Sequence, residues 1–320
     1  MLLPSPHSLR HNAAQLVSAA SAALPENAGR RLDRWFRGYE EACRLRDADA
    51  AIVSPGKSGR TWLRVMISRY FAHKYGLSEG LLMDYDEFHR AKPAVPLLHF
   101  THDNYLKDFL GHNRKLKTYS GKRVVLLVRD PRDTSVSSYF QWKHRMKPRK
   151  KVLNKYPKQD SGVFEFISSS PASVARLVDY LNLWAMDMPD FASLLLVRYE
   201  DMRHDPGKEL RRILEFVGQQ PSAGEIEDSV TYASLEQMRE RERQAAADAT
   251  VSSRLRPGDA GDLSTFKTRR GKVGGWRDYL TPEQAQAMDR LVADKLSPVY
   301  GYNPPAAIAA AADGGLVSPA

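Results

Sequence analysis

A chain of 320 residues is long enough for one large α/β domain with a sizeable core, or for two small domains. With 42% hydrophobic residues and no apolar run of membrane-spanning length, the composition predicts a soluble globular protein. Cys43 is the only cysteine, which excludes an internal disulfide, and the chain does not start with a signal-peptide pattern, so a cytoplasmic location is expected. The net charge of +10 favours anionic ligands or surfaces without choosing among them.

Composition divides the chain into three parts. Residues 1–47 have helical periodicity and predict helices packed on the main domain; a peripheral membrane contact of these helices stays open. Residues 48–302 form the main domain, and residues 303–320, rich in Ala, Gly and Pro, predict a disordered tail. Two charged segments that contain proline, 143–160 and 239–262, are typical of lids or substrate loops.

Short apolar runs predict the strands of the main domain. These runs are Ala51 to Val53, Leu97 to Phe100, Val124 to Val128, and Leu194 to Val197. Each is followed by a turn or a helical pattern, and this alternation predicts a doubly wound, mostly parallel sheet with helices on both faces. Ligands bind at the carboxyl ends of the strands in such a sheet.

The loop after the first strand carries the strongest functional signal. Beyond Ser54-Pro55-Gly56, the sequence predicts an amphipathic helix whose first residues are Lys57, Ser58, Gly59, Arg60 and Thr61. A helix N-terminus has unpaired N–H groups and a partial positive charge, so these cations and hydroxyls predict an anion site for a phosphate or a chemical relative of it. The pattern is not the nucleoside-triphosphate P-loop, because Ala51 stands where that loop requires glycine.

A second anion site is predicted at the end of the third strand. Arg129 follows that strand directly, and Ser137 lies two helical turns further on. An arginine fork and a hydroxyl can bind one phosphate, although Arg129 could instead pair with Asp130 or Asp133 in a structural turn. Between the two sites, the second strand delivers His102, whose ordinary pKa suits a general base. A histidine bonded beside the core is the alternative, and the position between two anion sites favours the base.

These motifs resemble the sulfotransferase family that uses 3′-phosphoadenosine 5′-phosphosulfate (PAPS), of the cytosolic type and in a bacterial-like form. The family loop for the 5′-phosphosulfate reads roughly PKSGTTW, and this chain has Gly56-Lys57-Ser58-Gly59-Arg60-Thr61-Trp62. The family segment for the 3′-phosphate reads RxPxDxxxS, and this chain has Arg129, Pro131, Asp133 and Ser137 in register. The remaining matches, within about residues 50–300 and in family order, are Thr101-His102, Tyr199-Glu200-Asp201-Met202, Arg269-Arg270-Gly271 and Gly274-Gly275-Trp276-Arg277.

The resemblance implies a PAPS-dependent sulfotransferase that moves a sulfuryl group to a hydroxyl or amine and releases adenosine 3′,5′-bisphosphate (PAP). It implies that His102 is the catalytic base and that Lys57 stabilises charge on the leaving oxygen. The implied cofactor-binding residues are Lys57, Ser58, Gly59, Arg60, Thr61, Trp62, Arg129, Ser137, Tyr199, Arg269, Arg270 and Gly271.

The chain departs from the family pattern at several positions. Arg60 stands where the family usually has threonine, which adds a cation beside the 5′ group, and Phe100 replaces a lysine two residues before the histidine. Gly275 replaces an aspartate. Leu235 stands where an aromatic ring usually packs on the adenine, which leaves Trp62 as the single ring for that base.

Two other functions stay open. A P-loop kinase acting on a small molecule would need a magnesium carboxylate after a strand, for which Asp130 or Asp201 could serve. A nucleic-acid or other polyanion-binding protein would depend on the net charge and on the basic run from Lys143 to Lys158. Aromatic residues are not interleaved in that run as base stacking requires, so no nucleic acid is expected.

No His, Cys, Asp or Glu cluster has metal-ligand spacing, so no metal is expected, and Asp103 is expected at the surface. The acceptor stays unidentified, because the segments predicted to line its pocket, 83–106, 139–160 and 239–265, carry no motif. Basic side chains there allow a small molecule, a glycan or a lipid headgroup. The sequence also leaves the oligomeric state open.

Overall fold

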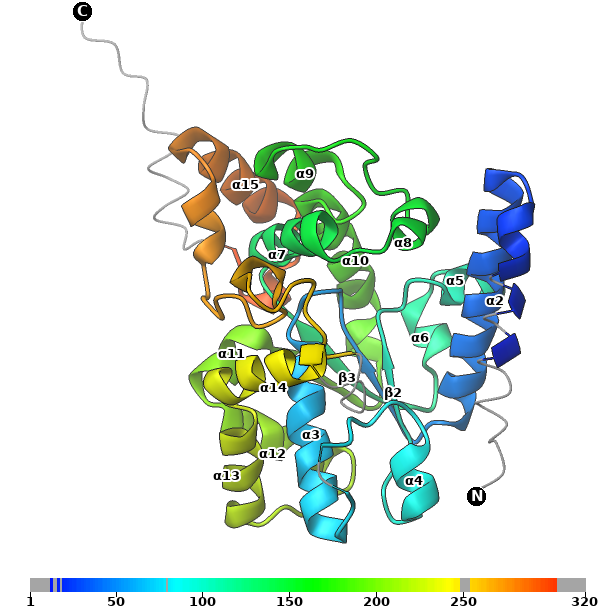
Figure 1. The fold of residues 1–320 in the computed structure, drawn as a ribbon, viewed down its shortest axis with the longest axis vertical. Coiled ribbons are helices and arrows are strands. Elements are labelled where there is room, and N and C mark those ends of the chain that lie inside the picture. The colour runs from blue at the N-terminus through cyan, green and yellow to red at the C-terminus, as the bar shows by residue number, and fades with distance from the viewer. Residues whose placement is uncertain (1–11, 14–15, 18, 79, 248–253, 304–320) are drawn as a thin grey trace, which may run out of the picture.

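The computed structural model describes residues 12–303, apart from residues 14–15, 18, 79 and 248–253. Residues 304–320 of the predicted tail therefore lie outside the described residues, and so do residues 1–11. The elements in chain order (Figure 1) are η1 (Ser21–Ala23), α2 (Glu26–Asp47), β1 (Ala50–Val53), α3 (Arg60–Tyr75), α4 (Glu87–Ala91), β2 (Leu98–Thr101), α5 (Leu106–Leu110), α6 (Lys115–Thr118), β3 (Arg123–Val128), α7 (Pro131–His144), α8 (Pro148–Leu153), α9 (Val163–Ser169), α10 (Val174–Asp187), η2 (Met188–Asp190), β4 (Leu194–Arg198), α11 (Tyr199–His204), α12 (Pro206–Phe216), α13 (Ala223–Tyr232), α14 (Leu235–Ala247), η3 (Leu263–Thr265), η4 (Gly275–Tyr279), α15 (Pro282–Lys295) and η5 (Pro298–Tyr300).

A four-stranded parallel sheet with the order β2-β1-β3-β4 organises the fold. Val53 at the end of β1 pairs with Thr101 of β2 on one side and with Leu126 of β3 on the other. The chain thus winds to opposite sides of β1, and ligands bind beyond the carboxyl ends of the strands at such a point. The four predicted strands and the doubly wound parallel sheet are confirmed.

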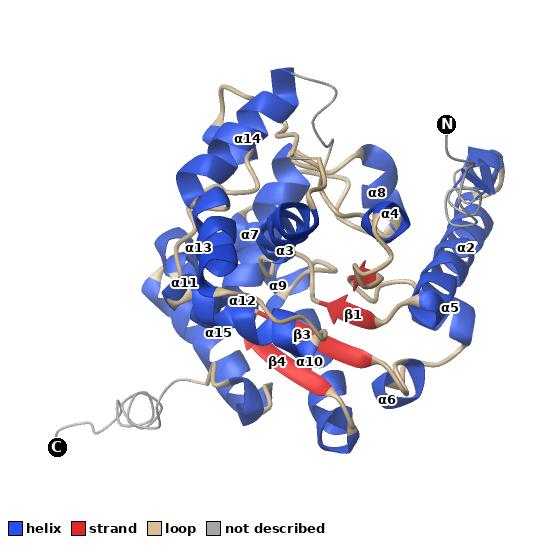
Figure 2. Ribbon diagram, turned by 90° about the horizontal axis from the view of Figure 1, so that it is seen from below, coloured by secondary structure: helices blue, strands red, loops and turns tan. Residues whose placement is uncertain are grey.

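Helices cover both faces of this sheet (Figure 2). Because side chains alternate along a strand, Ile52 and Leu127 pack on one face with α3, α12 and α13, whereas Ala51 and Leu126 pack on the other face with α7, α10 and α15. These four residues are fully buried. Burial on both faces explains why the strands read as continuous apolar runs in the sequence.

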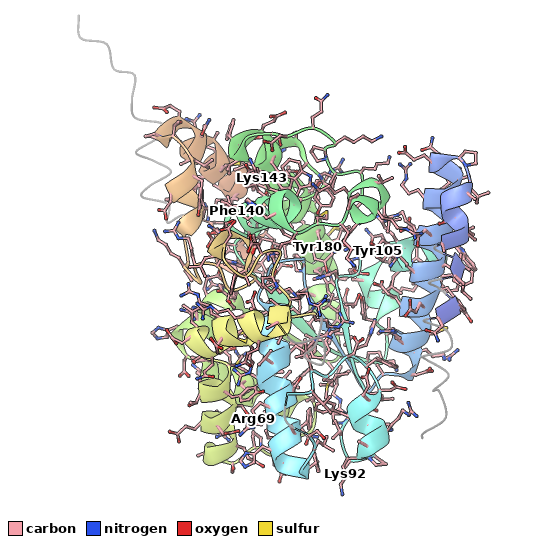
Figure 3. All side chains as sticks on the ribbon, in the orientation of Figure 1. Arg69, Lys92, Tyr105, Phe140, Lys143 and Tyr180 are labelled. Carbon is pink, nitrogen blue, oxygen red and sulfur yellow. The ribbon has the colours of Figure 1, made fainter. Side chains whose placement is uncertain are left out.

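Helix α3 begins at Arg60, which corrects the prediction that it starts at Lys57. Lys57 and Gly59 have φ angles of 74° and 90°. This left-handed backbone cannot continue into a right-handed helix, so residues 57–59 form a turn ahead of the helix. The helix is buried on most of its sides instead of being amphipathic, and Arg69 joins it to α13 by an ion pair with Asp228, N–O 2.6 Å (Figure 3).

The N-terminal helix α2 packs against α5 and α8. Trp35 and Tyr39 of α2 contact the ring of Phe109 in α5 with centroid distances of 5.3 and 5.4 Å. The division of the chain at residue 47 stays a prediction. Within the described ranges, no helix is long and apolar enough to cross a membrane.

Candidate active site

A cavity of about 920 Å³ opens at the carboxyl ends of the strands. Of the site residues that the sequence predicts, Ser58 alone does not line this cavity; it is buried under the loop. Those that the fold brings together there are Lys57, Gly59, Arg60, Thr61, Trp62, His102, Arg129, Ser137, Tyr199, Arg269, Arg270 and Gly271. Segments far apart in the sequence therefore share one wall, while the individual roles stay predictions.

The turn after β1 is held in an unusual backbone conformation. The ring of Tyr199 lies so close to Gly59 that a Cβ on Gly59 would stand 2.5 Å from a ring carbon. Glycine is therefore required there both by its φ of 90° and by this close approach. Burial lowers the pKa of the Lys57 ammonium well below its ordinary value, and the neighbouring cations Arg145 and Lys267 lower it further.

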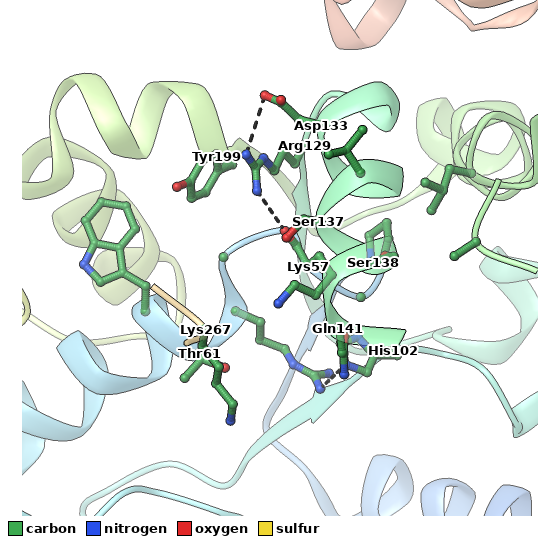
Figure 4. A pocket seen from close by; sticks show the side chains of 18 of the residues that line it. Lys57, Thr61, His102, Arg129, Asp133, Ser137, Ser138, Gln141, Tyr199 and Lys267 are labelled. Atoms are coloured by element: carbon green, nitrogen blue, oxygen red, sulfur yellow. Dashed lines mark hydrogen bonds and ion pairs between the residues drawn. The ribbon is translucent and has the colours of Figure 1, made fainter. Parts of the chain in front are cut away.

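Arg129 joins the two predicted anion sites. Its guanidinium lies over the ring of Tyr199 at 4.3 Å and donates a hydrogen bond to the backbone carbonyl of Lys57, N–O 3.3 Å (Figure 4). It also lies 3.5 Å from the carboxylate of Asp133, so the structural pairing considered from the sequence is present as well. Arg129 still lines the cavity beside Ser137, and therefore a phosphate there could compete with Asp133.

The closing segment is fastened to the same place by backbone contacts. The Asp133 carboxylate accepts hydrogen bonds from the N–H groups of Gly274 and Trp276, N–O 2.8 and 3.0 Å. Upstream, the fully buried carboxylate of Glu242 accepts from the N–H groups of Lys267 and Thr268, N–O 2.6 and 2.9 Å. These contacts hold the basic segment that contains Arg269 and Arg270 against the cavity.

His102 has a defined neutral tautomer. Its Nδ1 lies 2.9 Å from the carbonyl oxygen of Ser54, which can only accept, so Nδ1 carries the proton. Nε2 then holds the lone pair and accepts a hydrogen bond from Arg60, N–N 2.7 Å. Burial lowers the pKa of His102 well below its ordinary value, and the charge of Arg60 adds to this effect. The lone pair faces the cavity, as a base requires, but Arg60 occupies it.

Asp103, expected at the surface, is buried with 7% of its area exposed. The chain turns inward after β2, where the N–H of Asp103 donates to the hydroxyl of Thr101, N–O 2.8 Å, and φ of Asp103 is 55°. Lys115, itself 2% exposed, donates to the carboxylate, and its charge counters part of the burial cost that raises the pKa of Asp103. The pair fixes the backbone directly behind His102.

Several buried polar atoms near the cavity have no hydrogen-bond partner among the described residues. They include Ser58 Oγ in the loop and, in the cavity lining, Arg60 Nη1, Arg129 Nε and Arg145 Nε. Buried donors left unpaired cost free energy, and guanidinium donors are the kind that bind the oxygens of phosphate or sulfate. The donor set therefore fits an anionic nucleotide.

The two carboxylates that could bind magnesium in a kinase, those of Asp130 and Asp201, do not line the cavity. Asp130 caps α7 through the N–H of Arg132, N–O 2.8 Å, and also pairs with the guanidinium of that arginine. Asp201 is exposed and, like Asp130, does not line the cavity. In the part of the chain that the structure describes, no group of three or more His, Cys, Asp or Glu side chains could hold a metal ion.

The cavity also contains residues that the sequence motifs did not indicate. Arg34 comes from α2, Gln141 and Arg145 from the end of α7, Lys150 from α8, and Lys267 from the closing segment. The sequence indicates part of this set, because Arg145 and Lys150 lie in the basic segment 143–160, which is typical of a lid or substrate loop. Nothing in the spacing of Arg34 indicated that the N-terminal helix would reach the site.

Comparisons with known proteins agree with this geometry. Residues 47–299 match the family described as the sulfotransferase domain. Human sulfotransferase 2A1 is 25% identical over 273 residues, covering 79% of this chain and 86% of the human protein. Flavonol 3-sulfotransferase of Flaveria bidentis is 23% identical over 273 residues, covering 80% of this chain and 84% of the plant protein. The crystal structure of mouse sulfotransferase SULT7A1 complexed with PAP has the same fold, with a TM-score of 0.51, 23% identity, and coverage of 78% of this chain and 84% of that chain.

This chain belongs to the sulfotransferase family, an enzyme class, which confirms the resemblance that the motifs suggested.

Replacing Arg60 by threonine should raise the pKa of His102. The substitution removes a positive charge 2.7 Å from Nε2, so the imidazolium becomes less unfavourable, while burial keeps the pKa below its ordinary value. The measurement is an NMR pH titration of the His102 ring in the ligand-free protein. Arg60→Lys retains the charge and should move the pKa less. A pKa that stays the same or falls in Arg60→Thr would contradict the electrostatic coupling.

Proposed function

We propose that this sulfotransferase uses PAPS as its donor and transfers the sulfuryl group to a hydroxyl or amine of a small-molecule acceptor. The observation that carries the proposal is the pair of anion-binding strand ends, joined by the contact between Arg129 and the Lys57 carbonyl, with His102 between them. The PAP complex of the mouse relative supports the choice of nucleotide. The plant relative, named for a flavonol, supports a small-molecule acceptor.

In this proposal the two ends of the nucleotide have separate partners. The turn after β1, with Lys57, Arg60 and Thr61, would bind the 5′ group, helped by the N–H groups at the start of α3. Arg129 and Ser137, together with the segment 269–271, would bind the 3′-phosphate. Because Gly59 has no side chain, the backbone of this turn can lie close to the ring of Tyr199.

The adenine would lie near Trp62 and Tyr199, whose rings meet edge to face at 6.2 Å. Trp62 is held in place because its Nε1 donates to the carbonyl of Ala233, N–O 2.8 Å. Arg203 covers the Trp62 ring at 5.5 Å. A fixed indole of this kind supports a stacking role, with Leu235 supplying an aliphatic contact in place of the family's second ring.

When bound, PAPS supplies the sulfuryl group, which passes from the 5′-phosphate to the acceptor atom. His102 Nε2 would take the proton of the acceptor hydroxyl as the new bond to sulfur forms. Lys57 would stabilise the negative charge that is left on the bridging oxygen of the 5′-phosphate. Arg60 must release Nε2 for this step, so an anion that attracts the guanidinium of Arg60 would free the base.

Thermal shift tests the donor class. PAP without magnesium should raise the melting temperature, because a ligand that binds only the folded state at 100 times its Kd adds about 2.7 kcal/mol of stability. ATP with magnesium should give a smaller shift. Stabilisation by ATP with magnesium and none by PAP would support a kinase and contradict the proposal.

His102→Ala should lower turnover by roughly 10²- to 10⁴-fold, the usual contribution of general-base catalysis, and should leave PAP affinity nearly unchanged. Turnover is measured as transfer of labelled sulfate from PAPS to an acceptor found in a metabolite extract, and affinity by calorimetry. His204→Ala is the matched control, since His204 is exposed on α11 and away from the cavity. Near-normal turnover of His102→Ala would defeat the base assignment.

Arg129→Ala should weaken PAP binding by about 1.5–3 kcal/mol, the range for a hydrogen bond to a charged group. That loss corresponds to a roughly 10- to 150-fold rise in Kd, measured by calorimetry. Arg123, exposed at the opposite end of β3, provides the control variant Arg123→Ala, whose PAP affinity should match the wild type. Equal Kd values for Arg129→Ala and the wild type would remove Arg129 from the 3′-phosphate site.

A further inference from the structure

The cavity is far more cationic than one nucleotide requires. Among the residues that the structure describes, sixteen Lys and Arg residues line it, against three aspartates. PAPS carries about four negative charges at neutral pH, up to two of them on its 3′-phosphate. Most of the positive charge around this cavity is therefore not matched by the proposed donor.

Some of the remaining cations have partners in the protein. Arg34 pairs with Asp108, N–O 2.8 Å, and Lys115 donates to Asp103. For Arg145, Lys150 and Lys267, by contrast, no carboxylate of the described residues lies within 4.0 Å of the charged nitrogens. Two of the three aspartates in the lining already have cationic partners, because Asp103 pairs with Lys115 and Asp133 with Arg129. Asp179 is then the one lining aspartate that remains to balance the charges of these three cations.

The unpaired cations act on one another. Burial and the charge of Arg145 lower the pKa of Lys267 to about 8. The side chain of Lys150 is exposed, yet the protein around it lowers its pKa, and the charges of Arg60 and Arg145 lower it further. The buried carboxylate of Glu242 partly counters the charges of Lys267 and Arg145. The cations still outnumber it, so they repel one another, and a bound anion would relieve that repulsion.

Lys150 lines the same cavity as His102. Its charge adds to burial and to Arg60 in lowering the pKa of His102. Lys150 projects from α8, which is separate from both strand ends that form the proposed nucleotide site. Around it, the lining is rich in polar groups, with the amides of Asn104 and Asn154 and the ring of Tyr156.

We infer that the acceptor carries an anionic group, a phosphate or a carboxylate, which Lys150 and Arg145 bind while the nucleophilic hydroxyl faces His102. This inference rests on the proposed sulfuryl transfer and adds the substrate class. A polar, acidic acceptor fits a wall of amides and unpaired cations, whereas an apolar acceptor would leave these groups desolvated without partners. Lys150 is a specificity-determining residue in this arrangement.

The first experiment measures binding without turnover. Inorganic pyrophosphate is titrated by calorimetry into the protein already saturated with PAP. A second anion site should appear, and Lys150→Gln should weaken it about tenfold, as expected for the loss of about 1.4 kcal/mol. Lys147→Gln, at the N-cap of the same helix but outside the cavity lining, is the matched control and should bind as the wild type does. Absence of pyrophosphate binding, or binding that Lys150→Gln does not change, would overturn the inference.

The second experiment compares matched acceptors with PAPS as donor. The pairs are 3-(4-hydroxyphenyl)propanoate with its neutral amide, and glucose 6-phosphate with glucose. The anionic member should have the higher kcat/KM in the wild type, and Lys150→Gln should reduce that preference about tenfold. If Lys150→Gln slowed both members equally, Lys150 would serve the donor instead, and the inference would fail; a neutral preference in the wild type would overturn it as well. Failure of PAP to bind in the initial saturation step would instead contradict the proposed donor.

Discussion

The parallel pairing of β1 with β3 is the constraint on which the site depends. Val53 stands opposite Leu126, so the two strands end at the same edge, and parallel neighbours lie only about 4.8 Å apart. The turn after β1 and the residue after β3 must therefore be neighbours. Arg129 uses this proximity to reach the carbonyl of Lys57. One cavity lined by both proposed anion sites follows from that pairing, and β2, on the other side of β1, adds His102 beside it.

The turn after β1 has a backbone conformation that costs free energy and places Lys57 at the cavity. A left-handed backbone costs a residue other than glycine about 1–2 kcal/mol, and Lys57 bears that cost at φ 74°. The surrounding structure holds the backbone of Lys57 in this conformation, since Tyr199 packs against Gly59 and Arg129 donates a hydrogen bond to the Lys57 carbonyl. In exchange, the Lys57 ammonium enters the cavity ahead of the helix and the N–H groups of α3 stay open toward an anion. If the helix began at Lys57, this turn would be absent and the Lys57 ammonium would not lie ahead of the helix.

The sheet and much of the site were predictable because they depend on local signals. Buried parallel strands need continuous apolar runs, and a polar side chain that follows such a run must emerge at the strand end. Arg129 and His102 were found in this way. Lys150 and Arg34 were not, since each comes from a helix whose docking depends on long-range packing. Asp103 was misplaced for a related reason: its burial is tolerable only because Lys115, twelve residues further along, folds back to meet it.

The cations around the cavity show that the free protein is not optimised for stability. Lys57 and Lys267 are half-buried, and burial together with neighbouring cations lowers their pKa values. Lys150 is exposed, and its pKa is lowered by the surrounding protein and by the charges of Arg60 and Arg145. Folding brings these charges close to charges of the same sign, and Glu242 is an acidic group that counters Lys57 and Lys267. Natural proteins tolerate such costs where a ligand later recovers them. The cations extend from the strand ends to α8, so the anionic acceptor inferred above would lower these costs at the end of the cavity that the proposed donor does not reach.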